Sequence, residues 1–555
     1  MVSNREMSRM FSLYAELLLL HGGDGRFANL LSGASYRIKR MSEKVTDLEK
    51  QELSELFRPE ISRIIERLKK KKSIPALDEL IQLTPGGLFE MMQIKGLGGK
   101  KLSILWKTAE IDTIDALLEA CKDGRVSNIP GFGAKTQENI IKAITGYRSN
   151  TNRFHYASVA DYASDLVQML KNILRTKLIS LCGEVRRKST TIGAIEIVAA
   201  IDKKKLHSKE IRKALIIRSS ENGQSQGHTL DEIPVTIYHS TEEDFQNDLF
   251  THTGTEAHSN KVLAKIKGKK KFSSEKTIYE RAGLSFIVPE MREDSAEWTF
   301  KNKNEDLITP EAIKGVVHNH TTWSDGVDKL ADFVRACKHR QYEYVVISDH
   351  SKNAHYAGGL KEEKVLRQMA EIDGLNMELK PFKVFKSIEC DILVSGDLDY
   401  SNDLLKHFDL VIVSVHQLLK MDEEKATKRL IKAIENPYTT ILGHMTGRQL
   451  LIRPGYPVNF KKVIDACAAN KVIIEINANP YRLDMDWSHI PYALKKGIMI
   501  SVNPDAHSIS EIDNIRWGVE AARKGGLTKE MTWNAMPLKK IEAWLKNKKN
   551  HTPEL

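Results

Sequence analysis

The stretch GVVHNHTTWSDG (315–326) sets the fold class of the C-terminal part of the chain, because a short apolar run in it ends on His318 and His320. Short apolar runs between amphipathic helical stretches are typical of buried parallel strands, and a barrel of such strands carries its chemistry at their carboxyl ends. We therefore expect the polar residues at the ends of such runs to meet on one rim. Six more runs follow: YVVISDH (344–350), VFKSIECD (384–391), LVIVSVH (410–416), TTILGH (439–444), VIIEINAN (472–479) and IMISVNPDAH (498–507).

The residues at the run ends point to bound metal. The chain has 18 His, and a lone His is more often a surface or core residue than a ligand. Here imidazole or carboxylate recurs at one position of every run, where packing gives no reason for either. Mixed imidazole and carboxylate sets suit Mn²⁺, Zn²⁺ or Fe²⁺, and such ions lower the pKa of bound water from about 15.7 to near 7. The sequence therefore predicts a divalent-metal site that hydrolyses a phosphate ester.

These motifs, in this order, resemble those of the PHP phosphoesterase domain over residues 313 to about 545. The resemblance implies a distorted (β/α)7 barrel that holds three divalent metals, Mn²⁺ or Zn²⁺ with Fe²⁺ as an option. Val316 stands where an acidic residue is usual, at a position that is not a ligand. Glu475 receives no metal, and we expect it to be a supporting carboxylate. The implied ligands are His318, His320, Glu389 and Asp505 for one metal, Glu389 again with His416 and His444 for a second, and Asp325, His350 and His507 for a third.

Basic residues in the loops after the strands are candidates to hold the substrate phosphate. We single out Arg448 and Lys352 as possible phosphate contacts, with Arg453 and Arg482 as further candidates. A basic residue in a loop is more often simply solvated, so each is a candidate only.

Length and composition bound the class of protein. A chain of 555 residues is too long for one core, and a content of 41% hydrophobic and 28% charged residues is ordinary for a soluble protein. We find no apolar stretch of the ~18 to 20 residues that a membrane span needs and no secretory leader. Five scattered Cys favour a reducing cytoplasm. The net charge of +11 favours a polyanionic partner, and we expect a monomer with no membrane partner.

Glycine spacing in the N-terminal half predicts that this polyanion is DNA. IKGLGGKK (94–101) and IPGFGAKT (129–136) each place a Gly-x-Gly turn between helical patterns, as in a helix-hairpin-helix. Glycines allow a close approach, and the following helix aims free N–H groups at a phosphate, so binding would not depend on base sequence. Packing without DNA is the alternative. The expected contacts are Gly96, Gly98, Lys100, Gly131, Gly133 and Lys135.

The order of segments around these hairpins resembles a bacterial PolX-type family X DNA polymerase over nearly the whole chain. LCGEVRRKSTTIGAIEIV (181–198) is similar to the palm, and FTHTGTEAHSNKVL (250–263) and IYERAGLSFIVPEMRE (278–293) are similar to the thumb. The implied fold class is multidomain α/β, with an α+β, nucleotidyltransferase-like palm and thumb. The expected domains are a helical domain (1–85), a fingers-like helix-hairpin-helix domain (86–150), a palm (151–240), a thumb-like domain (241–295), a linker (296–312) and the barrel (313–555).

The palm departs from the family where the polymerase chemistry would lie. Two Mg²⁺ ions need three carboxylates, but the aligned positions are Ala194, Glu196 and Thr236. Glu184 also replaces the serine of a nucleotide-binding Gly-Ser and puts a negative charge where triphosphate would sit. A methyl group and a hydroxyl do not replace carboxylates at Mg²⁺. We therefore expect a palm that keeps its fold and has lost nucleotidyl transfer.

The sequence as a whole predicts a DNA-binding, metal-dependent phosphodiesterase of DNA repair. The resemblance implies a 3′-5′ exonuclease, with abasic-site endonuclease activity as a further option, acting on gapped, recessed or abasic DNA. Three alternatives stay open: a phosphatase for a small phosphate monoester, a repair polymerase that is still active, and a non-catalytic scaffold at DNA ends.

Overall fold

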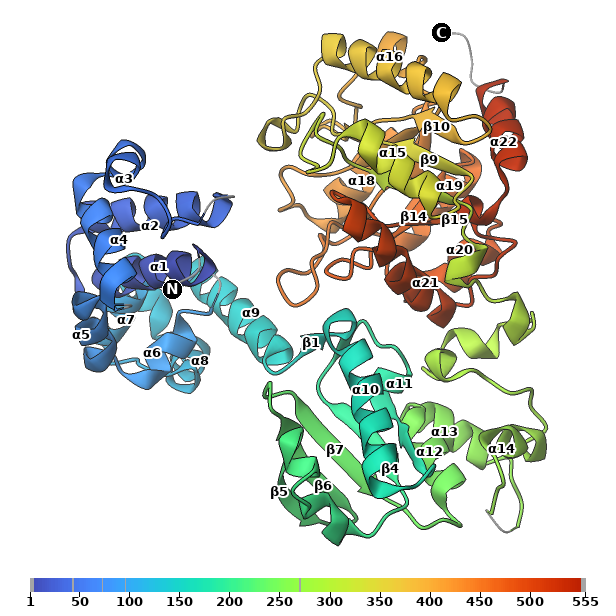
Figure 1. Ribbon diagram of the computed structural model, residues 1–555, viewed down its shortest axis with the longest axis horizontal. Helices are drawn as coiled ribbons and strands as arrows, with labels where there is room; N and C mark the ends of the chain where they lie inside the picture. The colour runs from blue at the N-terminus through green and yellow to red at the C-terminus, as the bar shows by residue number, and fades with distance from the viewer. Residues whose placement is uncertain (1–3, 42–43, 72, 95, 269–270, 551–555) are drawn as a thin grey trace. The chain divides into compact units, whose positions relative to one another are not determined.

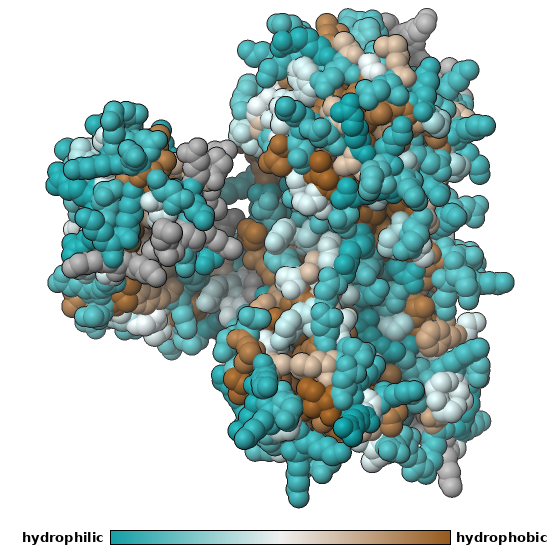
Figure 2. All heavy atoms as spheres, viewed as in Figure 1, coloured by the Kyte–Doolittle hydropathy of each residue, from teal (hydrophilic) through white to brown (hydrophobic). Residues whose placement is uncertain are grey.

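The protein is described by a computed structural model that covers residues 4–41, 44–71, 73–94, 96–268 and 271–550 (Figure 1). The chain divides into two compact units, Met1–Thr151 and Asn152–Leu555. Strands and helices alternate through much of the second unit, and the predicted multidomain α/β class is confirmed. Within the described residues no helix is long and apolar enough to cross a membrane. The face in Figure 2 is mostly hydrophilic, with hydrophobic residues in small groups.

The described residues of the first unit form helices without strands, and their buried apolar side chains make one hydrophobic core. Buried residues from Met7 to Ile144 belong to this core, which therefore includes both N-terminal segments that the sequence separates at residue 85. Pro75 at the first turn of α5 and Thr113 at the N-cap of α8 favour the starts of those helices. Its helices are α1 (Asn4–His21), α2 (Gly25–Arg40), α3 (Lys50–Leu56), α4 (Pro59–Lys71), α5 (Pro75–Leu83), α6 (Gly86–Met91), α7 (Gly99–Ala109), α8 (Ile114–Lys122), η1 (Val126–Asn128) and α9 (Ala134–Asn150).

The palm-like segment is built on a five-stranded mixed sheet with the order β2-β4-β7-β6-β5. β4 and β7 are parallel and the other pairs are antiparallel. A short antiparallel pair, β1 with β3, forms a separate two-stranded sheet. The elements are β1 (Phe154–His155), α10 (Tyr156–Leu174), β2 (Ile179–Leu181), α11 (Gly183–Arg186), β3 (Thr191–Ile192), β4 (Ile195–Ala199), η2 (Lys203–His207), η3 (Ile211–Lys213), β5 (Leu215–Glu221), β6 (Gln224–Thr229) and β7 (Pro234–His239).

The thumb-like segment and the predicted linker follow as short helices. A buried ion-pair network joins this segment to the palm, since Glu275 on α14 binds Arg186 on α11 at 3.0 Å and Arg292 at 2.5 Å. The elements are α12 (Phe245–Thr253), α13 (Glu256–Leu263), α14 (Glu275–Arg281), η4 (Pro289–Met291), η5 (Ala296–Trp298), η6 (Asn304–Asp306) and η7 (Pro310–Ala312).

The C-terminal segment contains eight parallel strands in two sheets, β8-β9-β10 and β11 through β15. Two single parallel bridges link one sheet to the other: Asn319 with Ala506, and His350 with Glu389. The run VFKSIECD thus forms two short strands, β10 and β11, and seven strand positions follow one another around the segment. The strands are β8 (Gly315–Asn319), β9 (Tyr344–Ile347), β10 (Lys383–Lys386), β11 (Glu389–Asp391), β12 (Val411–Ser414), β13 (Thr439–Leu442), β14 (Ile473–Asn477) and β15 (Ile500–Asn503).

Alternate residues of these strands pack into two different cores. Val316 belongs to the large core beneath the helices, whereas its neighbour Val317 packs with Trp533 and α22 in a second core. Strand geometry explains this, because successive side chains point to opposite faces. Helices lie around the strands in Figure 1: α15 (Leu330–His339), η8 (His355–Ala357), α16 (Glu362–Glu378), α17 (Asn402–Leu405), α18 (Glu423–Ile434), α19 (Phe460–Ala469), η9 (Trp487–His489), α20 (Ile490–Lys495), η10 (Ile509–Asn514), α21 (Ile515–Lys524), η11 (Trp533–Ala535) and α22 (Leu538–Asn550).

A buried lysine fastens the barrel segment to the palm and thumb within the second unit. Lys524, at the end of α21, is 1% exposed and donates to the carbonyl of Arg187 at 2.7 Å and to the carboxylate of Glu293 at 2.6 Å. Its ammonium also lies 5.1 Å from the ring of Trp487. A buried charge is tolerated when its donors are satisfied in this way.

Candidate metal centre and nucleic-acid interface

The carboxyl ends of the barrel strands bring the nine predicted ligand residues together. His318 is the next-to-last residue of β8, Glu389 is the first residue of β11 and lies beside the end of β9, and Asp505 follows β15. These residues are spread over almost 190 positions of the sequence, from 318 to 507. They meet because parallel strands place their carboxyl ends at one edge. The other six are His320, Asp325, His350, His416, His444 and His507, which lie in the segments after β8, β9, β12, β13 and β15.

The carboxylate of Glu389 is central to the cluster and is 1% exposed. Its Oε1 atom lies 2.9 Å from Nε2 of His444 and 3.2 Å from Nε2 of both His318 and His416. Its Oε2 atom lies 3.0 Å from Nδ1 of His350. One carboxylate with imidazoles on both oxygens is suited to bridge two metals.

Asp505 and Asp325 carry the remaining side of the cluster. Asp505 Oδ1 lies 3.2 Å from Nε2 of His320 and 3.7 Å from Nε2 of His318. Asp325 Oδ1 lies 3.4 Å from Nε2 of His507 and 3.6 Å from Nε2 of His350. His320 therefore stands between the two carboxylates, because its Nδ1 faces Asp325 at 3.9 Å.

Unpartnered polar atoms in the cluster fit bound metal. The buried Nε2 of His318, both ring nitrogens of His320, Nδ1 of His350 and Oε2 of Glu389 have no hydrogen-bond partner among the described residues. Leaving one such atom unsatisfied costs about 1 to 3 kcal/mol, so five in one place call for another partner. Imidazole nitrogen and carboxylate oxygen are ligands of Mn²⁺, Zn²⁺ and Fe²⁺.

Ligand atoms within 4.8 Å of one another form four overlapping groups. One group holds three of the four residues predicted for the first metal, and another holds the three predicted for the third metal together with His320, whereas Glu389 joins the other two groups with different partners. His318 and His350 therefore each approach Glu389 together with a residue of the predicted second metal. The groups are His318, His320 and Asp505; His320, Asp325, His350 and His507; His318, Glu389 and His444; and His350, Glu389 and His416.

Three further carboxylates hold these side chains in place. Glu475 accepts from Nδ1 of His318 at 2.6 Å, in the supporting role expected for it, and Asp391 accepts from Nδ1 of His416 at 2.5 Å. Asp349 accepts from the backbone N–H of Thr321 at 2.8 Å and so holds the loop that carries Asp325. Such partners fix the ring orientation and tautomer of a ligand. Sequence reasoning did not single out Asp349 and Asp391. Their positions inside the SDH and IECDI motifs could have indicated them.

Burial and neighbouring charges set the proton affinities of the cluster. Burial, with repulsion from His507 and His350, lowers the pKa of His320 to about 3, so its ring nitrogens are free to bind metal. Burial by itself would lower the pKa of His416, but Glu389 and Asp391 raise it to about 10. The pKa of Glu389 is held well below its ordinary value by His416 and His318, against the effect of burial.

Two ligand residues have left-handed backbone conformations. The φ angle is +65° at His318 and +51° at Asp505, a region that non-glycine residues rarely adopt. The backbone N–H of Ala506 donates to the carbonyl of His318 at 3.3 Å, which joins the two strained positions. Strain of about 1 to 3 kcal/mol per residue persists where the surroundings enforce it, and such positions concentrate at functional sites.

The four candidate phosphate contacts have different surroundings. Arg448 donates to the carbonyl of Arg482 at 2.9 Å and to Asp486 at 2.6 Å, and Arg453 donates to the carbonyl of Gly447. Both guanidinium groups are therefore used within the loops. Lys352 pairs with Glu362 at 3.3 Å on the surface. Arg482 is the one that reaches the cluster, with its Nε 3.7 Å from Oδ2 of Asp505.

Exposed apolar and aromatic side chains lie in the loops that follow the barrel strands. Each of six loops that follow barrel strands carries one such residue, between 55% and 71% exposed. The aromatic side chains among them offer faces on which nucleobases stack. The residues are Val327, Tyr356, Val394, Leu418, Ile452 and Tyr481.

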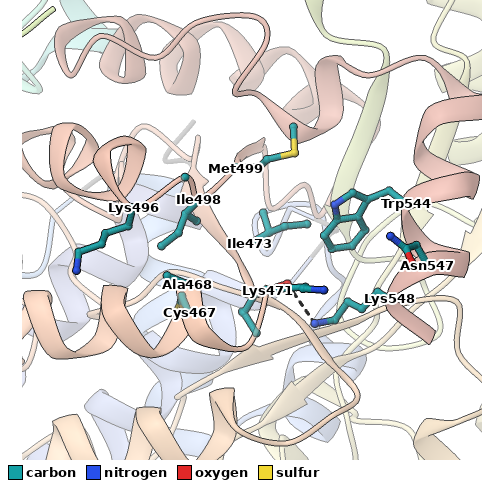
Figure 3. A pocket seen from close by; sticks show the side chains of 12 residues that line it. Cys467, Ala468, Lys471, Ile473, Lys496, Ile498, Met499, Trp544, Asn547 and Lys548 are labelled. Atoms are coloured by element: carbon teal, nitrogen blue, oxygen red, sulfur yellow. Dashed lines mark hydrogen bonds between the residues drawn. The ribbon is translucent and has the colours of Figure 1, made fainter. Parts of the chain in front are cut away.

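A small cavity of about 190 Å³ lies at the other end of the barrel (Figure 3). Ile473, Met499 and Trp544 line it at the amino ends of β14 and β15 and on α22. Lys548 extends toward it and donates to the carbonyl of Lys471 at 3.2 Å. In barrels of parallel strands this end serves stability, so this cavity is separate from the cluster.

In the palm, the one remaining carboxylate is bound by the protein itself. Glu196 accepts from the backbone N–H of Glu184 and from the hydroxyl of Tyr238, each at 3.0 Å. A Cβ at Gly183, where φ is +56°, would lie 1.8 Å from Oε2 of Glu196, so the backbone wraps closely around this carboxylate. Thr236 pairs with Glu196 across β4 and β7, so these two aligned positions lie side by side in the sheet.

Glu184 is likewise occupied within the palm. Its carboxylate accepts from Arg153 at 2.8 Å and from the backbone N–H of Gly193, next to Ala194, also at 2.8 Å. The carboxylates of both glutamates therefore accept hydrogen bonds from the protein at the position where the sequence resemblance places a nucleotide.

Both predicted hairpins form in the first unit. Gly96 (φ +90°) and Gly131 (φ +88°) turn the chain, and Gly98 and Gly133 are the N-caps of α7 and α9. A Cβ at any of these glycines would meet no atom within 4 Å, which leaves the turns open to a ligand. Lys100 and Lys135 are exposed in the first turns of the same helices, and Lys95 lies outside the described residues.

Three comparisons relate parts of this chain to known proteins. Residues 89–145 match the family described as SAM-like helix-hairpin-helix tandem. A Bacillus subtilis protein described as DNA polymerase/3′-5′ exonuclease PolX is 33% identical over 496 residues, which cover 85% of this chain and 86% of that protein. A probable phosphatase of Thermoanaerobacter sp. is 28% identical over 249 residues, 42% of this chain and 94% of that protein. A solved polymerase beta of Leishmania infantum matches with 14% identity and a TM-score of 0.22, over 37% of this chain and 98% of that one, which is too low to indicate a shared fold.

Proposed function

Because the chain belongs to the bacterial PolX family of DNA polymerase/3′-5′ exonucleases, we propose that it is a DNA-binding, metal-dependent phosphodiesterase that shortens DNA from 3′ ends. The observation that carries this proposal is the buried cluster around Glu389 with its unpartnered ring nitrogens. We propose that the nine clustered residues hold three divalent metals, Mn²⁺ or Zn²⁺, with Glu389 shared between two. When bound, such ions supply the Lewis acidity that polarises a phosphate ester and acidifies water.

The residues of the chain itself would position the DNA. Arg482, beside Asp505, is suited to bind the non-bridging oxygens of the scissile phosphate, because a guanidinium presents paired donors. Tyr356 and Tyr481 are suited to stack on the bases of an unpaired end. The hairpin amides of α7 and α9 would bind the DNA backbone without reading its sequence. Gapped, recessed and abasic DNA in repair are the proposed substrates.

We further propose that the palm has lost nucleotidyl transfer. Ala194 and Thr236 offer no carboxylate, and Glu196 is turned to the amide of Glu184. A triphosphate would meet the carboxylates of Glu184 and Glu196 instead of free donors. Repulsion between these like charges disfavours binding.

We also propose a cytoplasmic location and a monomeric state. The five cysteines are free and buried, which fits a reducing cytoplasm. We propose a monomer, because one chain supplies both the DNA-binding turns and all nine clustered side chains.

One assay tests the proposed activity directly. Labelled gapped, recessed and abasic DNA is incubated with the full chain, Mn²⁺ and all four dNTPs, and both shortened and lengthened products are read. We expect shortened products only. His320→Ala and Asp505→Asn should abolish shortening and leave DNA affinity intact, whereas His339→Ala, an exposed histidine on the same barrel, should behave as wild type. Cleavage that survives in His320→Ala and Asp505→Asn would refute the assignment of the cluster.

A phosphatase that acts on a small monoester is the second candidate. The alignment to a probable phosphatase over 94% of that protein's length favours it. Turnover of p-nitrophenyl phosphate and of an oligonucleotide, measured on one preparation, separates the two. A higher kcat/KM for the oligonucleotide supports the diesterase.

A further inference from the structure

The short strand β1 of the palm touches the loops around the metal cluster. The imidazole Nε2–H of His155 donates to the carbonyl of Leu450 at 3.0 Å. The same ring packs edge-on against the ring of Tyr481, with the centroids 4.7 Å apart. Both contacts lie within the second compact unit, and pairing with Thr191 of β3 anchors His155 in the palm.

The two contacted loops are joined to each other and lead to the cluster. The backbone N–H of Leu450 donates to the carbonyl of Tyr481 at 2.7 Å, so His155 contacts both members of one linked pair. The next residue, Arg482, approaches Oδ2 of Asp505 at 3.7 Å. Only two contacts therefore separate a palm residue from a proposed metal ligand.

The guanidinium of Arg482 has few partners within the protein, so it is available to a substrate phosphate. Its side chain is 20% exposed, and apart from the ion pair with Asp505 no hydrogen bond of its guanidinium is seen among the described residues. Arg448 holds the backbone of the same loop by donating to the carbonyl of Arg482. The loop is thus fixed on its barrel side by Arg448 and on its palm side by His155, while the Arg482 guanidinium keeps free donors.

We propose that His155 is a positioning residue for the hydrolytic reaction of the barrel: it holds the Leu450–Tyr481 pair and thereby aims Arg482 at the substrate phosphate. The proposal rests on the proposed phosphodiesterase function and goes beyond it, because it gives the palm a part in catalysis by another domain. A displacement of about 1 Å in a group that orients the reacting phosphate can cost about a hundredfold in rate.

A double-mutant cycle in the full chain tests this coupling. His155→Ala, Arg482→Ala and the double variant are compared for kcat and KM on a labelled single-stranded oligonucleotide with Mn²⁺. If His155 acts through Arg482, each single variant loses about tenfold or more in kcat, and the double variant loses no more than Arg482→Ala alone. His155→Gln, which keeps a side-chain N–H donor for Leu450, should recover part of the rate.

A matched control separates positioning from simple loosening of the interface. Asp161→Asn removes the exposed ion pair with Arg516, at 2.6 Å, which also joins palm and barrel. It should change kcat by less than about twofold, because surface pairs contribute little. Bound Mn²⁺ per chain should stay unchanged in His155→Ala.

The outcomes distinguish this inference from the proposed function. If the wild-type chain cleaves DNA but the losses of His155→Ala and Arg482→Ala multiply in the double variant, His155 does not act through Arg482 and the inference is overturned. Loss of Mn²⁺ from His155→Ala would overturn it as well, since the effect would then arise at the cluster. If the wild-type chain does not cleave DNA with Mn²⁺, it is the proposed function that fails.

Discussion

The carboxylate of Glu475 accepts a hydrogen bond from Nδ1 of His318 at 2.6 Å, with both side chains fully buried. This bond holds the proton on Nδ1, so that Nε2 faces Glu389 and Asp505 with its lone pair.

Weakening this bond should reduce metal affinity without removing a ligand. Glu475→Gln is expected to lower the affinity for Mn²⁺ by about 10- to 100-fold. Metal per chain, measured after dialysis at stepped Mn²⁺ concentrations, reports the change. Glu378→Gln, which removes only an exposed pair with Arg335 at 3.0 Å, is the control and should bind metal as wild type does. Equal affinity in Glu475→Gln would show that the bond has no role in metal binding.

Removal of metal should destabilise the barrel. The unpartnered atoms of His318, His320 and Glu389 lose their proposed partners, and binding to the folded state alone adds about 2.7 kcal/mol at 100 times Kd. The unfolding transition of the barrel should therefore fall by several degrees in chelator and return when Mn²⁺ is added. A transition at the same temperature in both conditions argues against bound metal.

The palm should not extend a primer. With Mg²⁺ or Mn²⁺ and dNTPs, both wild type and Glu196→Ala are expected to give background only, because Glu196 is bonded to the amide of Glu184 and to Tyr238. Products are read on a denaturing gel with the hydrolytic site disabled by His320→Ala, so that shortening does not hide extension. Extension that disappears in Glu196→Ala would mean that the palm is an active polymerase.

The hairpin lysines should contribute a salt-dependent part of DNA affinity. Lys100→Glu with Lys135→Glu is expected to weaken binding for every sequence tested. It should also reduce the slope of log K against log salt by about 0.9 per lost phosphate contact on duplex DNA. Lys50→Glu, an exposed lysine of the same unit, is the charge control. A slope equal to that of wild type would place the DNA elsewhere.

Glu275 should make folding stability depend on acid pH. Burial by itself would raise its pKa, but Arg186 and Arg292 lower it below the ordinary value of 4.5. A carboxyl with a lowered pKa contributes stability that is present above the unfolded pKa and is lost as the pH falls through the folded pKa. Wild type should therefore lose stability below about pH 4.5.

Glu275→Gln should remove this contribution and cost about 3 to 5 kcal/mol at pH 7, because it leaves buried arginines unpaired. Urea unfolding of the palm and thumb, followed between pH 3 and 8, gives both quantities, with Glu280→Gln on the same helix as the exposed control. An acid dependence as steep in Glu275→Gln as in wild type would assign it to other groups.

The sequence predicted those parts of the site that depend on residues close together in the chain. Apolar runs with His or Glu at their ends, such as TTILGH, specify strand and end residue together, and the structure brings all nine predicted ligand residues to one place. The break of VFKSIECD into two strands was not predicted, because it depends on pairing with different neighbours: β10 with β9, and β11 with β12.

The long-range contacts were beyond sequence reasoning. His155 and Leu450 are 295 positions apart, and no periodicity marks either of them. The environment of Arg448 was equally hidden, because its three acceptors come from a loop more than 30 residues away. The single core of the first unit arises from packing between α1, α5 and α7, which a change of composition near residue 85 does not reveal.

The buried ammonium of Lys524 limits how this gene can be divided. In a barrel that began at residue 313, the Lys524 ammonium would lose its acceptors on Arg187 and Glu293. The charge would then face solvent at a surface that the palm and thumb cover in the full chain. A chain that had inherited the barrel alone would first have to replace this lysine. The palm and thumb therefore cover a charge that the barrel does not satisfy with its own residues.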